Sequence, residues 1–211
     1  MLKFNVKQAL SLYLVTSESM ELEELLNKVE AAIQGGVTMV QLREKQSSGK
    51  LFLKKALALK SLTEKYEISL VINDRVDIAL AAGADGVHVG QSDLPAAYVK
   101  KIVPPSMFVG VSCSTVEEAK EAEKQGADYL GVGAVFPTNS KKDAERLEKG
   151  MLESIVESVN IPVVAIGGIN LENVQQLSHT GIDGIAVVSA ILSSNNPKLA
   201  AEMLKSARLK G

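Results

Sequence analysis

Acidic and amide side chains gather directly after two short aliphatic runs in the first half of the chain. Asn73 and Asp74 stand at the end of one run, and Asp93 follows the next. Two carboxylates that lie close together repel each other unless a cation or a proton sits between them. Mg²⁺ prefers such oxygen ligands and completes its shell with water and substrate phosphates. Asp74 and Asp93 are therefore candidate magnesium ligands, and the alternatives are a turn residue and a helix N-cap.

A second polar group lies in the last third of the chain and has the composition of an anion site. Hydroxyl and ammonium groups donate hydrogen bonds to phosphate oxygens, and glycine lets backbone N–H groups approach a ligand closely. The candidate residues are Thr138, Ser140, Lys141, Gly168, Val188 and Ser189. Taken singly, these segments are more typical of solvated loops or tight turns, but together they favour a phosphate site.

Polar residues also follow the other aliphatic runs. They are Gln41, Arg43, Lys45, Gln91, Ser112 and Ser114. His88 and His179 have no Cys or carboxylate at ligand spacing, which argues against a zinc site. Cys113 has no nearby His to activate it, so a buried structural thiol is the better interpretation.

The elements that must position these residues recur with one pattern. Eight aliphatic runs without apolar–polar alternation predict strands of a parallel sheet that is covered on both faces. They lie at 11–16, 39–43, 69–73, 86–90, 108–113, 129–134, 162–168 and 184–190. The segments between them show helical periodicity, as in Leu22, Leu25, Leu26, Val29 and Ile33, and several end at a glycine.

Eight strand-and-helix units predict a single (β/α)8 TIM barrel over residues 1–211, in preference to an open doubly wound sheet. The chain contains no Pro/Ser-rich linker or charge block that would divide it into domains. In such a barrel the loops after the strands converge on one rim. All the polar candidates above follow strands, so they are expected on that rim.

Composition narrows the classes of partner. The net charge of −2 offers no basic surplus for nucleic acid, and no window of about 18 apolar residues could span a membrane. One cysteine excludes an internal disulfide, and the N-terminus lacks the pattern of a signal peptide. We therefore expect a cytoplasmic protein that binds small phosphorylated molecules, either as a monomer or as a homo-oligomer.

Six ordered motifs resemble those of the thiamine phosphate synthase family, and the match runs from about residue 11 to residue 191. The motifs are LYLVT (12–16), QLREK (41–45), INDR (72–75), GVHVGQSDL (86–94), FPTNSKKD (136–143) and IGGI (166–169). The resemblance implies a transferase that joins a hydroxymethylpyrimidine diphosphate to a thiazole phosphate. Thiamine phosphate and pyrophosphate would be the products, and Mg²⁺ would assist a dissociative substitution.

The resemblance also implies a role for each matching residue. Gln41, Arg43, Lys45, Asn73 and Ser112 would hold the pyrimidine diphosphate, and Lys45, Asn73 and Arg43 would be catalytic. Asp74 and Asp93 would bind magnesium. Thr138, Ser140, Lys141, Gly168, Val188 and Ser189 would hold the thiazole phosphate.

Two residues depart from the family pattern. Ser140 stands where the family usually has Thr, which keeps the hydroxyl but loses a methyl group that stiffens the rotamer. Ser114 stands where the family commonly has His, so the contacts near Ser112 depart from the family pattern. Two other functions stay open: a thiazole tautomerase of the same fold, and a non-catalytic barrel that binds a phosphorylated ligand. The residues Lys45, Asn73, Asp74 and Asp93 argue against the tautomerase, which needs no diphosphate site.

Overall fold

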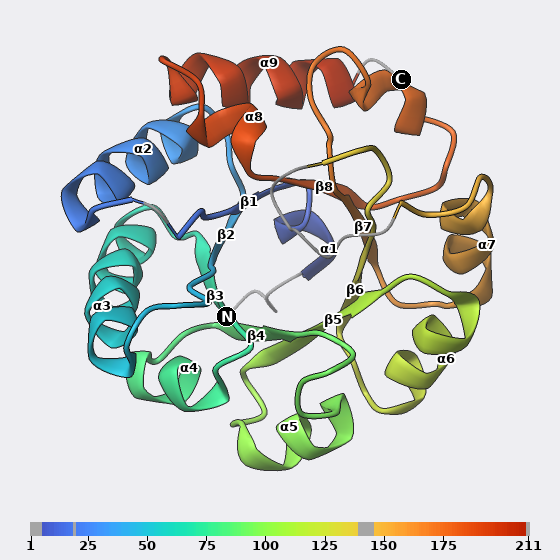
Figure 1. Ribbon diagram of the computed structural model, residues 1–211, viewed down its shortest axis with the longest axis horizontal. Helices are drawn as coiled ribbons and strands as arrows, with labels where there is room; N and C mark the ends of the chain where they lie inside the picture. Colours follow the sequence, from blue (N-terminus) through green and yellow to red (C-terminus); the bar gives the residue numbers. More distant parts are fainter. Residues whose placement is uncertain (1–5, 19, 139–145, 210–211) are drawn as a thin grey trace.

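Eight strands close into a parallel barrel in the computed structural model, which describes residues 6–18, 20–138 and 146–209 (Figure 1). The strands are β1 (Leu12–Val15), β2 (Met39–Leu42), β3 (Ser69–Asn73), β4 (Gly86–Val89), β5 (Phe108–Cys113), β6 (Tyr129–Val132), β7 (Val163–Ile166) and β8 (Gly184–Val187). Each strand pairs with the next, and β1 pairs with β8, for example through Tyr13 and Ala186. The predicted (β/α)8 barrel is confirmed, and the open sheet is excluded.

Helices form a ring outside the strands (Figure 1). They are α2 (Leu22–Gln34), α3 (Gly49–Lys65), α4 (Val76–Ala82), α5 (Ala96–Ile102), α6 (Val116–Lys124), α7 (Met151–Ser158), α8 (Ser189–Leu192) and α9 (Pro197–Leu209). A short helix, α1 (Val6–Ala9), precedes β1. Within the described part of the chain, no helix is long and apolar enough to cross a membrane.

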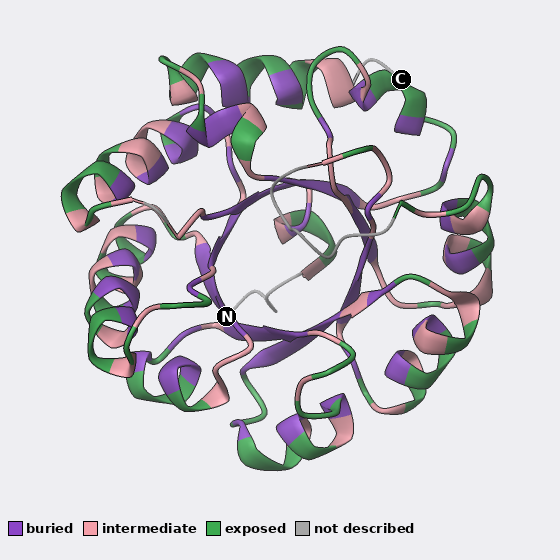
Figure 2. Ribbon diagram, in the orientation of Figure 1, coloured by how far each residue is buried: buried purple, intermediate pink, exposed green. Residues whose placement is uncertain are grey.

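The strands are mainly apolar and almost entirely buried because both of their faces are covered, as the largely purple ring in Figure 2 shows. One large apolar cluster packs between the strands and the helices. A second, smaller cluster fills the inside of the barrel and includes Tyr13, Met39, Phe108 and Tyr129. The described residues therefore pack the barrel interior near its N-terminal end.

Helix α2 illustrates how the sequence pattern produces the outer layer. Leu25, Val29, Ala32 and Ile33 are buried, and their spacing places them on one face of the helix. The helix ends where Gly36 adopts a φ of 102°, a left-handed conformation that side chains rarely allow. The glycines predicted to end the other units behave in the same way: Gly83, Gly126 and Gly181 all have positive φ.

The crossover between β7 and β8 differs from the others, because it contains only the 3₁₀ turn η1 (Val174–Leu177). Its asparagines explain the difference. The Asn173 side chain accepts a hydrogen bond from the Asn170 N–H, and the Asn170 side chain accepts one from the Glu172 N–H. Such local hydrogen bonds compete with regular helix.

Glycines on the inner face make room for aromatic rings. A Cβ atom on Gly110 would lie 2.1 Å from Cζ of Tyr129, and one on Gly131 would lie 3.1 Å from Cε1 of His88. At the N-terminal end, Leu10 and the adjacent α1 pack against this inner cluster. Arg208 of α9 joins that end by donating to the Ser11 carbonyl at 3.0 Å. Apolar side chains thus fill the interior at this end, and the predicted polar site residues lie at the other end.

Candidate active site

A cavity of about 1230 Å³ opens at the carboxyl ends of the strands. Its position agrees with the predicted rim, because loops from every part of the chain contribute to the cavity wall. The structure brings together the following predicted residues: Gln41, Arg43, Lys45, Asn73, Asp74, Asp93, Ser112, Thr138, Gly168, Val188 and Ser189. Ser140 and Lys141 lie outside the described residues.

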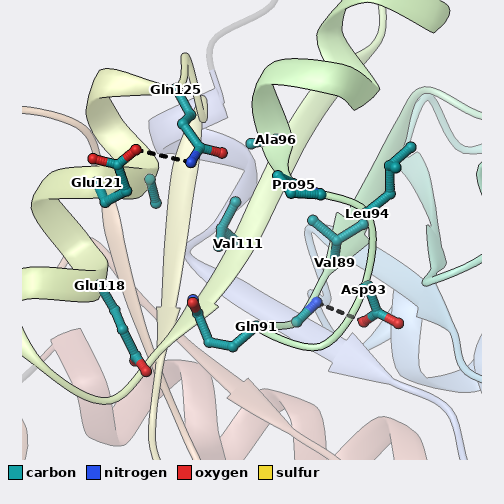
Figure 3. Close-up of a pocket in the computed structure, with 12 residues that line it drawn as sticks. Val89, Gln91, Asp93, Leu94, Pro95, Ala96, Val111, Glu118, Glu121 and Gln125 are labelled. Carbon is teal, nitrogen blue, oxygen red and sulfur yellow. Dashed lines mark hydrogen bonds between the residues drawn. The ribbon is translucent and has the colours of Figure 1, made fainter.

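Two carboxylates and a lysine form the acidic part of the wall. Lys45 Nζ donates to a carboxylate oxygen of Asp74. Asp74 directly follows β3 and has a φ of 61°, a left-handed conformation that Asp tolerates better than most residues. Asp93 accepts a hydrogen bond of 2.8 Å from the Gly90 N–H, which fixes the loop after β4 (Figure 3). The two acids therefore come from neighbouring strands and face one space.

The pKa of Asp93 is raised above its ordinary value. Burial is the main cause, and the hydrogen bond and charge of nearby Asp74 act in the same direction. The Gly90 N–H and the charge of Lys45 oppose the rise. A divalent cation between the two acids would relieve their repulsion, so the residues fit a magnesium ion. The described residues contain no cluster of three or more His, Cys, Asp and Glu that could hold a metal, so water and phosphate would supply the remaining ligands.

The alternative roles of these acids fare differently. Asp93 is not a helix N-cap, because Pro95 occupies the N-cap position of α5. Asp74 does lie in a tight turn, where the Arg75 N–H donates to the Asn73 carbonyl at 2.7 Å, but its side chain also lines the cavity. The turn and the site are therefore two aspects of the same residue.

A buried ion pair holds the loop that carries Arg43 and Lys45. Glu44, which lies between them, is almost fully buried and accepts a hydrogen bond of 2.8 Å from Lys55 of α3. Lys55 also donates to the Met20 carbonyl at 3.0 Å, which ties in the loop after β1. Because Glu44 is held against α3, its two neighbours are left to line the cavity. This pair was not predicted, because the contact between Glu44 and Lys55 depends on how α3 packs against the loop.

A chain of hydrogen bonds crosses the floor of the cavity. Gln41 Nε2 donates to the Tyr13 hydroxyl at 2.6 Å, and that hydroxyl lies 3.0 Å from the Tyr129 hydroxyl. His88 continues the chain, with Nδ1 at 2.9 Å from the Tyr129 hydroxyl and Nε2 at 2.9 Å from Ser112 Oγ. His88 is a satisfied strand residue, as expected, but its partners reach the site. Gln41 and Ser112, at the two ends of this series of hydrogen bonds, are both predicted pyrimidine-binding residues.

The opposite part of the wall is shaped by backbone. Gly167 and Gly168 follow β7 with φ of 102° and 65°. A Cβ atom on Gly168 would lie 2.4 Å from the Pro137 carbonyl oxygen, so this strand end packs directly against the segment that leads to Thr138. Asn173 Nδ2 donates to the Gly168 carbonyl at 2.9 Å and holds the turn in place. Backbone N–H groups here can approach an anion without obstruction by side chains.

Beside Ser112, two neighbouring residues have structural roles. Cys113 is buried, and burial, with a smaller contribution from the charge of Glu118, raises the pKa of its thiol to about 12. The thiol therefore stays protonated at neutral pH, as expected for a structural cysteine. Ser114 donates from its N–H to Glu118 at 2.7 Å, and the Glu118 N–H donates to Thr115, the N-cap of α6, so this departure from the family pattern also helps to begin a helix.

A smaller cavity of about 130 Å³ lies behind the loop that carries Asp93, between α5 and α6 (Figure 3). Its polar lining is already paired: Glu121 accepts a hydrogen bond of 2.9 Å from Gln125, and Glu118 is bound by Ser114. Pockets for small-molecule ligands are several times larger. The main cavity is therefore the candidate active site.

Comparison with known proteins identifies the family. A family model described as thiamine monophosphate synthase matches residues 12–191. The chain belongs to the thiamine monophosphate synthase family. It is 53% identical over 195 residues to the thiamine-phosphate synthase of Methanobrevibacter smithii, with 92% of this chain and 93% of the relative covered. It is 56% identical over 195 residues to that of Ruminiclostridium cellulolyticum, with the same coverage.

A solved structure agrees with this assignment. The thiamine phosphate pyrophosphorylase from Pyrococcus furiosus is 42% identical, has a TM-score of 0.89, and covers 98% of both chains. The resemblance stated from the motifs is confirmed, and so is the prediction of an enzyme of the transferase class. The roles of the individual site residues stay predictions.

Proposed function

We propose that the chain is a thiamine-phosphate synthase that joins 4-amino-2-methyl-5-hydroxymethylpyrimidine diphosphate to 4-methyl-5-(2-phosphoethyl)thiazole. One observation carries the proposal: the acidic residues Asp74 and Asp93 line the same cavity as the glycine turn at Gly168. The names of the relatives support the product, since they are described as thiamine-phosphate synthases. The cavity volume of about 1230 Å³ is sufficient for two small molecules side by side.

Each part of the cavity wall suits one substrate. Arg43, Lys45 and Asn73 offer donors to a diphosphate, and Gln41 and Ser112 lie deeper, where the pyrimidine ring would bind. Thr138, Gly168, Val188 and Ser189 would receive the thiazole phosphate, together with Ser140 and Lys141 of the segment outside the described residues. Barrels of this class commonly bind phosphate at the loops after their seventh and eighth strands.

The chemistry requires stabilisation of the leaving group more than proton transfer. The attacking thiazole nitrogen carries no proton, so no general base is needed. As the bond to the diphosphate breaks, negative charge grows on its oxygens, and the Lys45 ammonium and the Arg43 guanidinium are placed to neutralise it. A magnesium ion held by Asp74 and Asp93 would supply further charge neutralisation when bound. Asn73 would orient the diphosphate through its side-chain amide.

The pairing of Lys45 with Asp74 also has a mechanistic use. Asp74 keeps the Lys45 ammonium group at the cavity wall. One charge pair at about 4 Å is worth about 4 kcal/mol at an effective dielectric near 20, which corresponds to nearly a thousandfold in rate. Arrival of a diphosphate gives Lys45 a second anionic partner, so the cation is already in place for the developing charge.

The deciding experiment measures pyrophosphate release from the two purified substrates with and without Mg²⁺. Release that requires both substrates and the metal supports the synthase. Conversion of the thiazole phosphate to a tautomer, without release, would support the tautomerase instead, and binding without any conversion would support a non-catalytic barrel. A cytoplasmic location is part of this proposal, and cell fractionation would test it.

A further inference from the structure

The hydrogen bonds beneath the cavity form a series in which each member donates to the next. The direction of donation determines which donors and acceptors face the substrate. The five members of the series come from β1, β2, β4, β5 and β6: Tyr13, Gln41, His88, Ser112 and Tyr129. Neither tyrosine is placed to touch the diphosphate or the thiazole by the proposed function, and both are almost fully buried. Buried polar groups of this kind must pair with one another, so the direction of the hydrogen bond at one end constrains the directions of the others.

Both tyrosines carry their hydrogen at neutral pH. Burial raises the pKa of the Tyr13 hydroxyl and of the Tyr129 hydroxyl well above the ordinary value. Each hydroxyl therefore has one hydrogen to donate and must find an acceptor for it. Aromatic contacts make the arrangement rigid. The Tyr129 ring lies edge-on to the Tyr13 ring with 6.1 Å between the two centroids, and its centroid lies 5.4 Å from that of the His88 ring.

The orientation of the Gln41 amide fixes one order of donors. Gln41 Nε2 donates to Tyr13, and among the described residues the Tyr13 hydroxyl has only Gln41 and Tyr129 as hydrogen-bond partners. Tyr13 must therefore donate to Tyr129, and Tyr129 then donates to His88 Nδ1. The hydrogen of the imidazole is left on Nε2, which donates to Ser112 Oγ, and the Ser112 hydrogen is free to point into the cavity.

A reversed order is also complete, provided that the Gln41 amide turns over. Its oxygen would then accept from Tyr13, every following donor would become an acceptor, and Ser112 would donate to His88. In the first order Gln41 presents its carbonyl oxygen and Ser112 presents a donor. In the reversed order Gln41 presents its N–H₂ group and Ser112 presents an acceptor. Intermediate arrangements either leave a buried hydroxyl hydrogen without an acceptor or set the two tyrosine oxygens against each other with no hydrogen between them.

We infer that Tyr13, Tyr129 and His88 are positioning residues that couple Gln41 to Ser112, so that these two groups set their donor and acceptor pattern together toward the pyrimidine ring. This inference rests on the proposed function for the identity of the ring. An aminopyrimidine offers an N–H donor beside ring-nitrogen acceptors, which matches the carbonyl and hydroxyl presented in the first order. A pyrimidine with an oxo group in place of the amino group has the opposite pattern of donors and acceptors, so both Gln41 and Ser112 would disfavour it.

Nitrogen-15 NMR of the histidine side chains tests the coupling without any turnover. The chain has two histidines, and exposed His179 serves as the internal control. In the wild type, we expect His88 to carry its hydrogen on Nε2. Gln41→Glu, once ionised, can only accept from Tyr13, so it should move the His88 hydrogen to Nδ1 as the pH rises from about 6 to about 10, a range that includes the pKa of a buried Glu.

The decisive control adds Tyr13→Phe to Gln41→Glu. This double variant cuts the chain at its first link, so His88 should return to the Nε2 form. A hydrogen that stays on Nδ1 in the double variant would reflect the new charge alone and would overturn the coupling. No change in His88 over the whole pH range in Gln41→Glu would overturn it as well.

Binding supplies the functional readout. Tyr13→Phe should weaken the affinity for the pyrimidine diphosphate by about three- to tenfold, as expected for one hydrogen bond, and leave the affinity for inorganic pyrophosphate unchanged. Thr180→Val is the matched control, because it removes a buried hydroxyl that donates to the Leu177 carbonyl away from the cavity. Equal losses for pyrimidine diphosphate and pyrophosphate would overturn the ring-specific role. If the wild type binds no pyrimidine diphosphate, the proposed function fails, and the NMR result still decides the coupling.

Discussion

The two sides of the cavity are built by different means. On the side of β2 to β5, charged side chains hold one another: Lys45 pairs with Asp74, and Glu44 pairs with Lys55 beneath them. On the side of β7 and β8, glycines shape the backbone, and one asparagine, Asn173, holds it. Charge stabilisation needs side chains that can carry charge, whereas a stable phosphate needs only a close and rigid set of donors. We expect substitutions on the first side to act on turnover and those on the second side to act on binding.

The largest expected effect is that of Asp93→Asn. It keeps the size of the side chain but removes a charge that would hold magnesium beside the leaving group. Turnover should fall by about a thousandfold, equivalent to about 4 kcal/mol, with an unchanged unfolding temperature. Pyrophosphate release measured over a range of Mg²⁺ concentrations checks this. Glu117→Gln, on the exposed first turn of α6, is the control, and turnover of Asp93→Asn within threefold of the wild type would contradict the metal role.

Next in size is the loss of stability in Lys55→Met. This change leaves the Glu44 carboxylate buried without its cation, which costs about 3–5 kcal/mol of unfolding free energy. Adding Glu44→Gln should recover part of the loss. Urea unfolding provides the measurement. The exposed pair of Lys65 and Glu30, at 2.9 Å, is the comparison, and Lys65→Met should leave the unfolding midpoint nearly unchanged.

Gly168→Ala should raise KM for the thiazole phosphate by about 10- to 100-fold and leave KM for the pyrimidine diphosphate unchanged. The added methyl group would meet the Pro137 carbonyl and would displace the turn that receives the phosphate. Gly83→Ala is a close control, because Gly83 has a φ of 61° against 65° for Gly168 but open space around it. Both variants lose about 1–2 kcal/mol through backbone strain. Equal KM values in the two variants would contradict a role of this turn in binding.

The smallest effect is expected for Asn173→Ala. It removes two hydrogen bonds of 2.9 Å, the one to the Gly168 carbonyl and the one from the Asn170 N–H, and so loosens the turn. KM for the thiazole phosphate should rise about three- to fivefold, in line with about 1 kcal/mol for the bond that holds Gly168. Steady-state kinetics with the thiazole phosphate varied will detect the change. Gln176→Ala, an exposed substitution on η1, should behave like the wild type.

Much of the barrel could be predicted from the sequence because its signals are local. Each strand is covered on both faces and therefore appears as a continuous apolar run, and Gly83 or Gly126 marks the end of a helix by its left-handed conformation. The strand after Cys113 was predicted to run from 129 to 134, whereas β6 ends at Val132. The 3₁₀ turn η1 also differed, because side-chain hydrogen bonds of the asparagines outweighed helical periodicity there.

The candidate site was predictable only where residues follow strands in a barrel. Asp74, Asp93 and Gly168 could be found in that way, since the rim is a property of the fold. The pairing of Glu44 with Lys55 depends on how α3 packs on the sheet, and the contact of His88 with Tyr129 depends on strand register. A usable signal for the latter existed in Gly110 and Gly131, whose missing side chains leave space for large rings on neighbouring strands.

The closed end of the barrel limits the order in which ligands can enter and leave. Since Leu10 and α1 fill the interior at the N-terminal end, the main cavity described here opens toward the strands' carboxyl ends. Under the proposed function, a pyrimidine bound beside Gln41 on the floor of the cavity would have to enter before any molecule that covers it. By the same route, the product that lies nearer the opening would leave first. Because the barrel is closed at its N-terminal end, the depth at which a molecule binds would set the order in which it enters and leaves.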